Sequence, residues 1–206
     1  VEKAEHLKKY ANLWRITNDF WDSWEDIMEM FDRCNNWAPY VSEGCFPDCD
    51  MLPVGHISIR GCEHGLSDRW TRLSKAEQRT MLTLWNIFRS PLMIGCELTD
   101  MDEWTKALLT NEEVLSLLKT SRNAHQTIRQ GDMIVWQAEG EEGNVFLAVF
   151  NTTNWSETFA IDFRALDLTG SYKLRDLWAQ KELGEVEGKL IVGVDSHDAK
   201  LYKLSK

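Results

Sequence analysis

The stretch LWRITNDFWDSWEDI, residues 13–27, places a short apolar run, a polar turn and the start of an amphipathic helix in direct succession. The run NLWRI (12–16) has the length of a buried strand. Asp22 to Glu25 resembles a capping box, and apolar residues from Trp24 onward recur at helical spacing. The stretch therefore predicts a strand that leads directly into a helix, which is the repeating unit of an alternating α/β fold.

Two further units of this kind follow along the chain. GCFPDCDMLPVG (44–55) is expected to form a loop that runs into a short strand around residues 50–54. A Ser-x-x-Glu capping box at Ser74 begins the next helix, and PLMIG (91–95) predicts another buried strand after it. Successive strands joined by helices lie parallel, because each crossover carries the chain back to the same end. Shorter helices are expected over residues 1–11, 101–109 and 111–119.

The spacing of apolar residues changes from about 3.6 to about 2 beyond residue 125. Strand-like runs separated by Gly, Asn, Asp and Glu turns then follow one another: MIVWQAE, NVFLAVFN, ETFAIDF, YKLRDLW, KLIVGV and AKLYKLS. Such a series predicts a small antiparallel β-sandwich. We therefore expect two domains, an α/β part over residues 1–125 and an all-β sandwich over residues 126–206.

The composition excludes two classes of partner. The 206 residues carry a net charge of −10 with a pI near 5.0. No run of Lys or Arg is long enough to follow a phosphate backbone, so a nucleic acid is not an expected partner. No apolar stretch approaches the roughly 18 residues that a bilayer requires, so a membrane is not expected either. The ten tryptophans leave two roles open, because aromatic rings pack hydrophobic cores and also form platforms for sugar rings.

The five cysteines do not have the spacing of a disulfide scaffold, and at least one of them must be unpaired. A zinc site built from Cys45, Cys49, Cys62 and His64 is an alternative, although its spacing matches no structural zinc pattern well. We expect buried free thiols, and neither a metal ion nor a cofactor.

Carboxylates lie beside each of the three predicted strands. Asp19 comes after NLWRI, Asp48 and Asp50 lie in PDCDMLPVG, and Glu97 follows PLMIG. Ligands of parallel α/β folds bind at the carboxyl ends of the strands, so these side chains are expected on one rim. Each also has a structural explanation. Asp19 would serve as a helix N-cap, Asp48 and Asp50 as turn formers, and Glu97 as a charge in the first turn of a helix.

Two features of this rim point to carbohydrate chemistry. Trp14, Trp21 and Trp70 are expected near its acids, and Trp14 is expected to contact bound substrate. A glycosidase combines such an aromatic surface with carboxyl groups that donate a proton and stabilise positive charge. Arg15 lies on the first strand between a tryptophan and an isoleucine, where a guanidinium needs acidic partners. From the residues alone, the prediction is an acidic site at the strand ends of a parallel α/β fold.

Three segments taken together, LWRITNDFWDSWEDI, PDCDMLPVG and TMLTLWNIFRSPLMIGCEL, resemble glycoside hydrolase family 27, which contains α-galactosidases and α-N-acetylgalactosaminidases. The resemblance covers nearly the whole chain and is strongest over residues 10–98. It implies a (β/α)8 barrel followed by a C-terminal antiparallel β-domain. A complete barrel needs about 250 residues. The chain is therefore expected to contain only the C-terminal part, a partial TIM barrel of the last three or so βα units, together with the sandwich.

The resemblance also implies roles for individual residues. Asp19 matches the general acid/base, and Arg15 matches an arginine that binds sugar hydroxyls and orients the acid/base. Asp50 and Met51 match the aspartate and methionine that line the sugar pocket. Asp48 matches a second aspartate that supports Asp50 from behind.

The expected activity is that of a retaining α-glycosidase that hydrolyses terminal α-D-galactosides through a glycosyl-enzyme intermediate. Alternatives are an α-N-acetylgalactosaminidase, a β-L-arabinopyranosidase, and a carbohydrate-binding fragment without catalysis. The resemblance implies a carbohydrate substrate. It leaves the location open and favours a secreted or periplasmic protein over a cytoplasmic one only if the full-length protein carries a signal peptide. The expected protein partner is either the N-terminal half of the barrel or a second copy of the chain.

The chain by itself is expected to be inactive. A retaining glycosidase needs two carboxyl groups about 5 Å apart, and the resemblance places the nucleophile on a strand that precedes NLWRI. Incubation of the purified 206-residue chain with p-nitrophenyl α-galactoside should therefore release no p-nitrophenol above background. Turnover by this polypeptide alone would contradict the expectation.

Overall fold

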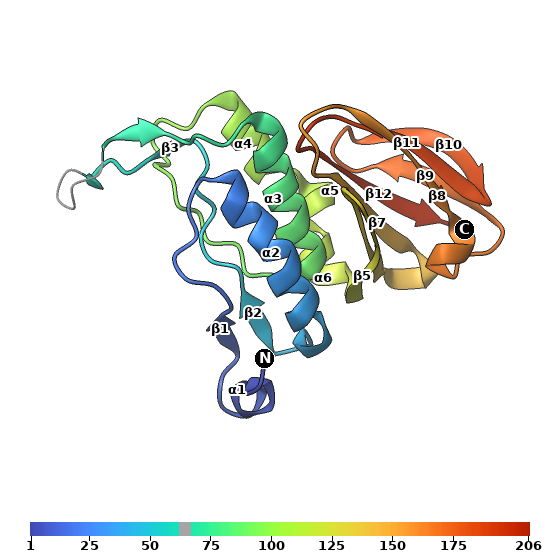
Figure 1. Cartoon of the computed structure of the whole chain (residues 1–206), viewed down its shortest axis with the longest axis horizontal. Coiled ribbons are helices and arrows are strands. Elements are labelled where there is room, and N and C mark those ends of the chain that lie inside the picture. Colours follow the sequence, from blue (N-terminus) through green and yellow to red (C-terminus); the bar gives the residue numbers. More distant parts are fainter. Residues whose placement is uncertain (62–66) are drawn as a thin grey trace.

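The chain folds into an α/β part followed by a β-sandwich, as the sequence predicted (Figure 1). The computed structural model describes residues 1–61 and 67–206. None of the helices in these ranges is both long and apolar enough to cross a membrane. The α/β part contains α1 (Ala4–Tyr10), α2 (Trp24–Trp37), a short 3-10 turn (Ala38–Tyr40), α3 (Lys75–Phe88), α4 (Glu103–Leu109), α5 (Glu112–Leu115) and α6 (Leu117–Thr120).

Two parallel strands lead to Asp19, Asp48 and Asp50, which the sequence predicted on one rim. β1 (Leu13–Arg15) pairs in parallel with β2 (Phe46–Asp48), so that Arg15 lies opposite Asp48. Helix α2 forms the crossover between them. This arrangement confirms the parallel pairing that the alternation of strands and helices predicted.

The second and third predicted strands differ from the observed ones. The second strand, β2, spans Phe46–Asp48 and not the expected residues 50–54. PLMIG (91–95) forms only a parallel bridge, between Ile94 and Leu52. The run is not buried as predicted, since Ile94 is 49% exposed. The apolar pattern was misleading because, among the described residues, this segment has only the bridge to Leu52 and no further strand beside it.

The two long helices begin at serine N-caps. Ser74 and Glu77 form the reciprocal capping box that was predicted for α3. The start of α2 was predicted incorrectly, because Ser23 rather than Asp22 is its N-cap and accepts a hydrogen bond from the Asp26 N–H at 3.1 Å. Asp22 caps no helix, and its buried side chain instead pairs with Arg69 and Arg72.

The β-sandwich consists of a six-stranded antiparallel sheet and a two-stranded pair packed against it. The sheet has the strand order β10-β9-β12-β7-β6-β5, and β8 pairs with β11. The strands are β5 (Arg122–Gln130), β6 (Met133–Glu139), β7 (Val145–Asn151), β8 (Glu157–Asp162), β9 (Ser171–Asp176), β10 (Lys181–Glu187), β11 (Lys189–Val194) and β12 (Ala199–Ser205). Short 3-10 turns at Glu141–Gly143 and Phe163–Leu166 lie between β6 and β7 and between β8 and β9 along the chain.

The six predicted strand runs correspond to six of these eight strands. β5 and β10 were missed because their residues are mostly polar and at least partly exposed, so that they lack a clear apolar alternation. The division into residues 1–125 and 126–206 passes through β5. We propose a boundary just before Arg122, where that strand begins.

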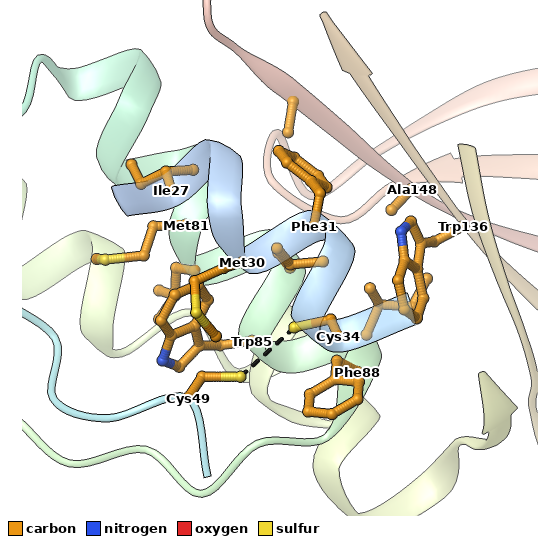
Figure 2. Close-up of a cluster of buried hydrophobic side chains, with 14 of the residues drawn as sticks. Ile27, Met30, Phe31, Cys34, Cys49, Met81, Trp85, Phe88, Trp136 and Ala148 are labelled. Carbon is orange, nitrogen blue, oxygen red and sulfur yellow. Dashed lines mark hydrogen bonds between the residues drawn. The ribbon is translucent and has the colours of Figure 1, made fainter. Parts of the chain in front are cut away.

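Helix α3 lies between the two parts and contacts both. Every residue from Thr80 to Phe88 is buried. Figure 2 shows Trp136 of β6 and Ala148 of β7 on the sheet side of the same hydrophobic cluster. Phe88 and Trp136 meet edge to face with ring centroids 6.2 Å apart. The cluster therefore extends without a break from the helices into the six-stranded sheet.

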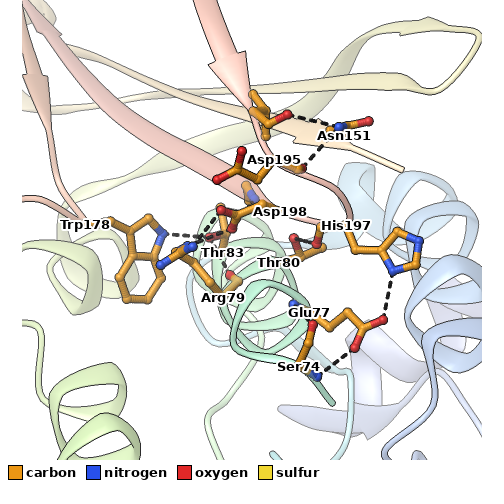
Figure 3. Close-up of polar contacts among 12 residues, drawn as sticks. Ser74, Glu77, Arg79, Thr80, Thr83, Asn151, Trp178, Asp195, His197 and Asp198 are labelled. Carbon is orange, nitrogen blue, oxygen red and sulfur yellow. Dashed lines mark hydrogen bonds and ion pairs between the residues drawn. The ribbon is translucent and has the colours of Figure 1, made fainter. Parts of the chain in front are cut away.

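Polar contacts cross the same junction (Figure 3). Arg79 of α3 forms a bidentate ion pair with Asp198 at 2.7 and 2.6 Å. Thr80 Oγ1 donates a hydrogen bond to the His197 carbonyl at 2.7 Å, and His197 Nδ1 lies 2.8 Å from Glu77 Oε1. Bidentate pairs are strongly directional, so these contacts fix the orientation of the sandwich relative to α3.

Candidate active site

Arg15 joins the exits of the two parallel strands. It is the last residue of β1, and its Nη2 lies 3.1 Å from Asp19 Oδ1 and 2.9 Å from Asp50 Oδ2. Asp19 follows β1 and Asp50 follows β2. One guanidinium therefore holds carboxylates from two separate chain segments on one rim, and three of the predicted site residues lie together.

A tight turn after β2 positions Asp50. Its backbone N–H donates a hydrogen bond to Asp48 Oδ1 at 2.9 Å. Its φ of 77° lies in the left-handed region, which aspartate enters more readily than most residues. Asp50 Oδ2 also accepts a hydrogen bond from the Phe20 N–H at 2.8 Å. Asp50 is thus held through both its backbone and its carboxylate.

Asp48 faces the interior rather than the open rim. The residue is 3% exposed, and burial raises the pKa of its carboxyl group. The neighbouring Asp50 charge raises this pKa further, whereas the hydrogen bond from the Asp50 N–H lowers it. Asp48 therefore contacts the turn that carries Asp50 and does not face solvent on the rim.

The three residues on the rim differ in exposure. The side chain of Asp19 is 87% exposed, that of Arg15 38%, and that of Asp50 14%. Asp19 caps no helix, since α2 begins only after Ser23. An exposed carboxyl group beside a fixed one can exchange a proton with a bound molecule while the fixed one accepts its hydrogen bonds.

Met51 presents an apolar surface next to these carboxylates. It packs against Gly95, where an added Cβ would come within 2.8 Å of Met51 Sδ. A larger residue at position 95 would therefore displace the methionine. Met51 and Gly95 line a hollow together with Trp21, whose ring was predicted to lie near the acids.

Trp14 lies away from the rim. The alternation of side chains along β1 turns it to the face opposite Arg15, where it is 7% exposed. Its ring packs against Trp37 with centroids 5.9 Å apart. The indole N–H is buried without a hydrogen-bond partner among the described residues. Trp14 therefore packs in the core and does not lie on the rim beside Arg15, where it was predicted to contact substrate.

Glu97 stabilises a local turn. It accepts hydrogen bonds from the Thr99 N–H at 2.9 Å and from the Thr99 hydroxyl at 2.7 Å. These bonds lower the pKa of Glu97. Arg15, Asp19 and Asp50 form a group that we call the Arg15 cluster. Thr99 does not belong to it, so Glu97 is not joined to Asp19 and Asp50.

The described cysteines are free thiols, as the sequence predicted. Cys34 and Cys49 lie in the core with their sulfur atoms 3.5 Å apart (Figure 2). Burial raises the pKa of the Cys34 thiol well above its usual value. Of the alternative zinc set, Cys62 and His64 lie outside the described residues. Within residues 1–61 and 67–206, no group of three or more potential ligands is placed to hold a metal ion.

Asp22 is a buried carboxylate whose role the sequence did not indicate. Its side chain is 0% exposed, and Arg69 forms a bidentate ion pair with it, one contact of which is 2.8 Å. The Arg72 N–H donates a further hydrogen bond at 2.7 Å. Burial alone would raise the pKa of Asp22, but the hydrogen bonds from Arg69 and Arg72 outweigh it and lower the pKa. No local pattern could reveal a pair 47 residues apart.

Arg69 belongs to a short hairpin at the rim. β3 (His56–Ile57) pairs antiparallel with β4 (Arg69–Trp70). Figure 1 shows β3 projecting from the end of the α/β part at which α2 and α3 begin. The Asp22–Arg69 pair therefore ties the loop after β1 to this hairpin.

The other face of the hairpin carries a histidine held by two acids. His56 makes hydrogen bonds to Asp68 and Asp100 and stacks on Trp70 with ring centroids 5.4 Å apart. The bonds to Asp68 and Asp100 raise the pKa of His56. Trp70 remains 47% exposed, so it is an outer aromatic surface of the hairpin rather than a core residue.

Comparison with known proteins places both parts of the chain in one enzyme family. The family model described as α-galactosidase A matches residues 2–120. A second model, described as the α-galactosidase C-terminal β-sandwich domain, matches residues 130–204.

Three relatives illustrate the range of similarity. A family 27 β-L-arabinopyranosidase from Geobacillus stearothermophilus, solved in complex with arabinose, is 46% identical with a TM-score of 0.96, over 100% of this chain and 48% of that one. A candidate α-N-acetylgalactosaminidase structure from Bacillus halodurans is 38% identical with a TM-score of 0.84, over 92% and 46% of the two chains. An α-galactosidase from Oryza sativa subsp. japonica is 28% identical over 96% of this chain and 45% of its own length. The chain thus spans about half the length of the relatives it matches.

The Asp22–Arg69 ion pair should make the free energy of unfolding depend on pH. Asp22→Asn should lower the free energy of unfolding at pH 7 by about 2 kcal/mol, because Arg69 loses its charged partner in a buried setting. The pKa of Asp22 is lowered in the folded state, so its contribution is complete above the unfolded-state value near 3.8 and is lost as the pH falls through the folded-state pKa. Urea unfolding should therefore show the wild-type and variant free energies converging below about pH 4.

Asp32→Asn is the matched control for this measurement. Asp32 also pairs with an arginine, Arg129, but its side chain is 65% exposed. Loss of an exposed pair should cost less than about 1 kcal/mol. Equal destabilisation by the two substitutions would show that burial of the Asp22 pair contributes nothing.

Proposed function

The chain belongs to glycoside hydrolase family 27, the α-galactosidase family, and on this basis we propose that it forms part of a β-L-arabinopyranosidase. The α-D-galactosidase that the sequence resemblance favoured becomes the second candidate. Because the chain covers about half the length of its relatives, the activity is proposed for the full-length gene product.

The degree of sequence identity supports β-L-arabinopyranosides as the substrates. The chain is 46% identical to the Geobacillus stearothermophilus β-L-arabinopyranosidase along its whole length, against 28% to the Oryza sativa α-galactosidase and 30% to an α-galactosidase from Coffea arabica. β-L-Arabinopyranosides and α-D-galactopyranosides present the same ring hydroxyls and differ by the hydroxymethyl group of galactose. The residues that bind the hydroxyls therefore serve either sugar.

The cluster around Arg15 supplies the sugar contacts in this proposal. Asp50 uses Oδ2 for its contacts with Arg15 and the Phe20 N–H, and its Oδ1 accepts hydrogen bonds from ring hydroxyls. Arg15 donates to a hydroxyl from the same side. Met51 lies against the apolar face of the sugar. Asp48 keeps Asp50 in position by accepting the hydrogen bond from its N–H.

Asp19 acts as the general acid/base. Its exposed carboxyl group protonates the glycosidic oxygen as the bond to the leaving group breaks, and the carboxylate then removes a proton from the water that releases the sugar. Arg15, 3.1 Å away, fixes the direction in which Asp19 points. Retention of configuration requires a second carboxylate as nucleophile, and we assign none of the described carboxylates to that role.

A comparison of substrates tests the proposal. The full-length gene product should hydrolyse p-nitrophenyl β-L-arabinopyranoside with a kcat/KM about tenfold or more above that for p-nitrophenyl α-D-galactopyranoside, since a pocket shaped for the pentose excludes the extra hydroxymethyl group. A higher value for the galactoside would support the second candidate. Saturable sugar binding without turnover of either substrate, or of the α-N-acetylgalactosaminide, would support a binding module instead.

The role of Asp19 is tested by Asp19→Asn in the same full-length protein. Turnover should fall by about 100-fold or more, because the amide cannot donate the proton. Affinity for free L-arabinose and the unfolding temperature should remain as in the wild type, since Asp19 is exposed. Asp32→Asn, which alters another exposed arginine-paired aspartate, should retain full activity. Unchanged kinetics of Asp19→Asn would remove Asp19 from the mechanism.

A further inference from the structure

A hollow of about 470 Å³ adjoins the proposed sugar site. Met51 and Gly95 form its side next to the Arg15 cluster, and Trp21 forms a second wall. The remaining wall comes from the hairpin, through Ile57, Ser58 and Ile59. Arg60 and Gly61 complete the lining, and the other side chains except Ser58 are apolar.

Two walls of the hollow are tied to each other by one buried ion pair. Trp21 is the chain neighbour of Asp22, and Ile57 lies opposite Arg69 in the hairpin. The bidentate contact between Asp22 and Arg69 therefore fixes the spacing between the Trp21 wall and the hairpin wall. A hollow whose walls are held apart in this way is largely formed before a ligand enters, which lowers the entropic cost of binding.

Ser58 of the hairpin wall has an unusual local structure. The hydroxyl oxygen of Ser58 is buried, and no described residue forms a hydrogen bond with it. Buried hydroxyl groups in folded proteins are nearly always paired. Ser58 also has a φ of 59°, in the left-handed region, so the chain adopts an uncommon conformation at the same point. Ser58 therefore marks a bend in the hairpin wall, with its hydroxyl oxygen turned away from the hollow.

The position of the hollow defines what part of a glycoside would enter it. Asp19 delivers its proton to the glycosidic oxygen in the proposed function, and Trp21 follows Asp19 by two residues. Met51 is shared between the sugar site and the hollow. A glycoside with its sugar against Asp50 and Met51 therefore directs its leaving group along Trp21 toward Ile59.

We propose that this hollow is a binding site for the leaving group and that it selects glycosides with an aromatic aglycone. A flat aromatic ring matches the indole of Trp21 and the aliphatic surfaces of Met51 and Ile59. The inference rests on the proposed glycosidase function and specifies the substrate class of the same site.

The test compares the binding of two thioglycosides that resist hydrolysis. Phenyl and methyl 1-thio-β-L-arabinopyranoside share the sugar and differ only in the aglycone, and their affinities for the full-length gene product are measured by titration calorimetry. The phenyl compound should bind about tenfold more tightly, because its ring is removed from water in the hollow. Ile59→Ser should reduce this ratio to about threefold or less.

Ile191→Ser is the matched control. Ile191 is 60% exposed on β11 of the sandwich, and Ile59 is 40% exposed on the hairpin, so neither substitution opens a cavity in the core. The control should keep the tenfold ratio, and both variants should bind free L-arabinose like the wild type. An unchanged ratio in Ile59→Ser, or equal affinities of the two thioglycosides in the wild type, would overturn the inference while leaving the proposed function intact. Failure of every variant to bind arabinose and both thioglycosides would overturn the proposed function and the inference with it.

Discussion

The carboxylate of Asp50 connects the two chain segments on which the candidate site depends. It forms an ion pair with Arg15 at the end of β1 and accepts a hydrogen bond from the N–H of Phe20 in the loop that follows. Its own backbone adopts a left-handed conformation that Asp48 stabilises from the interior. Removal of this carboxylate would break the contact between Phe20 and the turn after β2. Asp50 and Arg15 together therefore hold the segment that carries Asp19 next to the proposed sugar pocket.

Helix α3 connects Asp50 to the β-sandwich. Its Trp85 indole N–H donates a hydrogen bond to the Asp50 carbonyl at 3.2 Å, and its ring packs against Phe20 with centroids 5.0 Å apart. Two turns earlier, Arg79 holds Asp198 of the sandwich. One helix thus supports the rim and orients the sandwich at the same time. The sandwich contributes to the site by burying α3 rather than by supplying a rim residue.

Local chemistry predicted much of the fold. The capping box at Ser74 and the apolar stripe after it predicted α3, and the alternation of strand and helix predicted the parallel pairing of β1 with β2. PLMIG was predicted as a buried strand and is largely exposed, because burial of an apolar run depends on what lies against it. Trp14 was expected on the rim but faces the core, because side chains on a strand alternate and Arg15 occupies the other face.

The sequence by itself indicated an α/β part, a change to a sandwich at about residue 125, and the residue types on the rim, since these follow from backbone periodicity and local capping. The tertiary structure alone decided which acids share Arg15, why Asp22 is buried, and that Trp21 and the β3–β4 hairpin enclose a hollow. The physical reason is distance along the chain. Arg15 and Asp50, or Asp22 and Arg69, meet only after the intervening helix and strand have packed, and no local preference of either residue specifies that meeting.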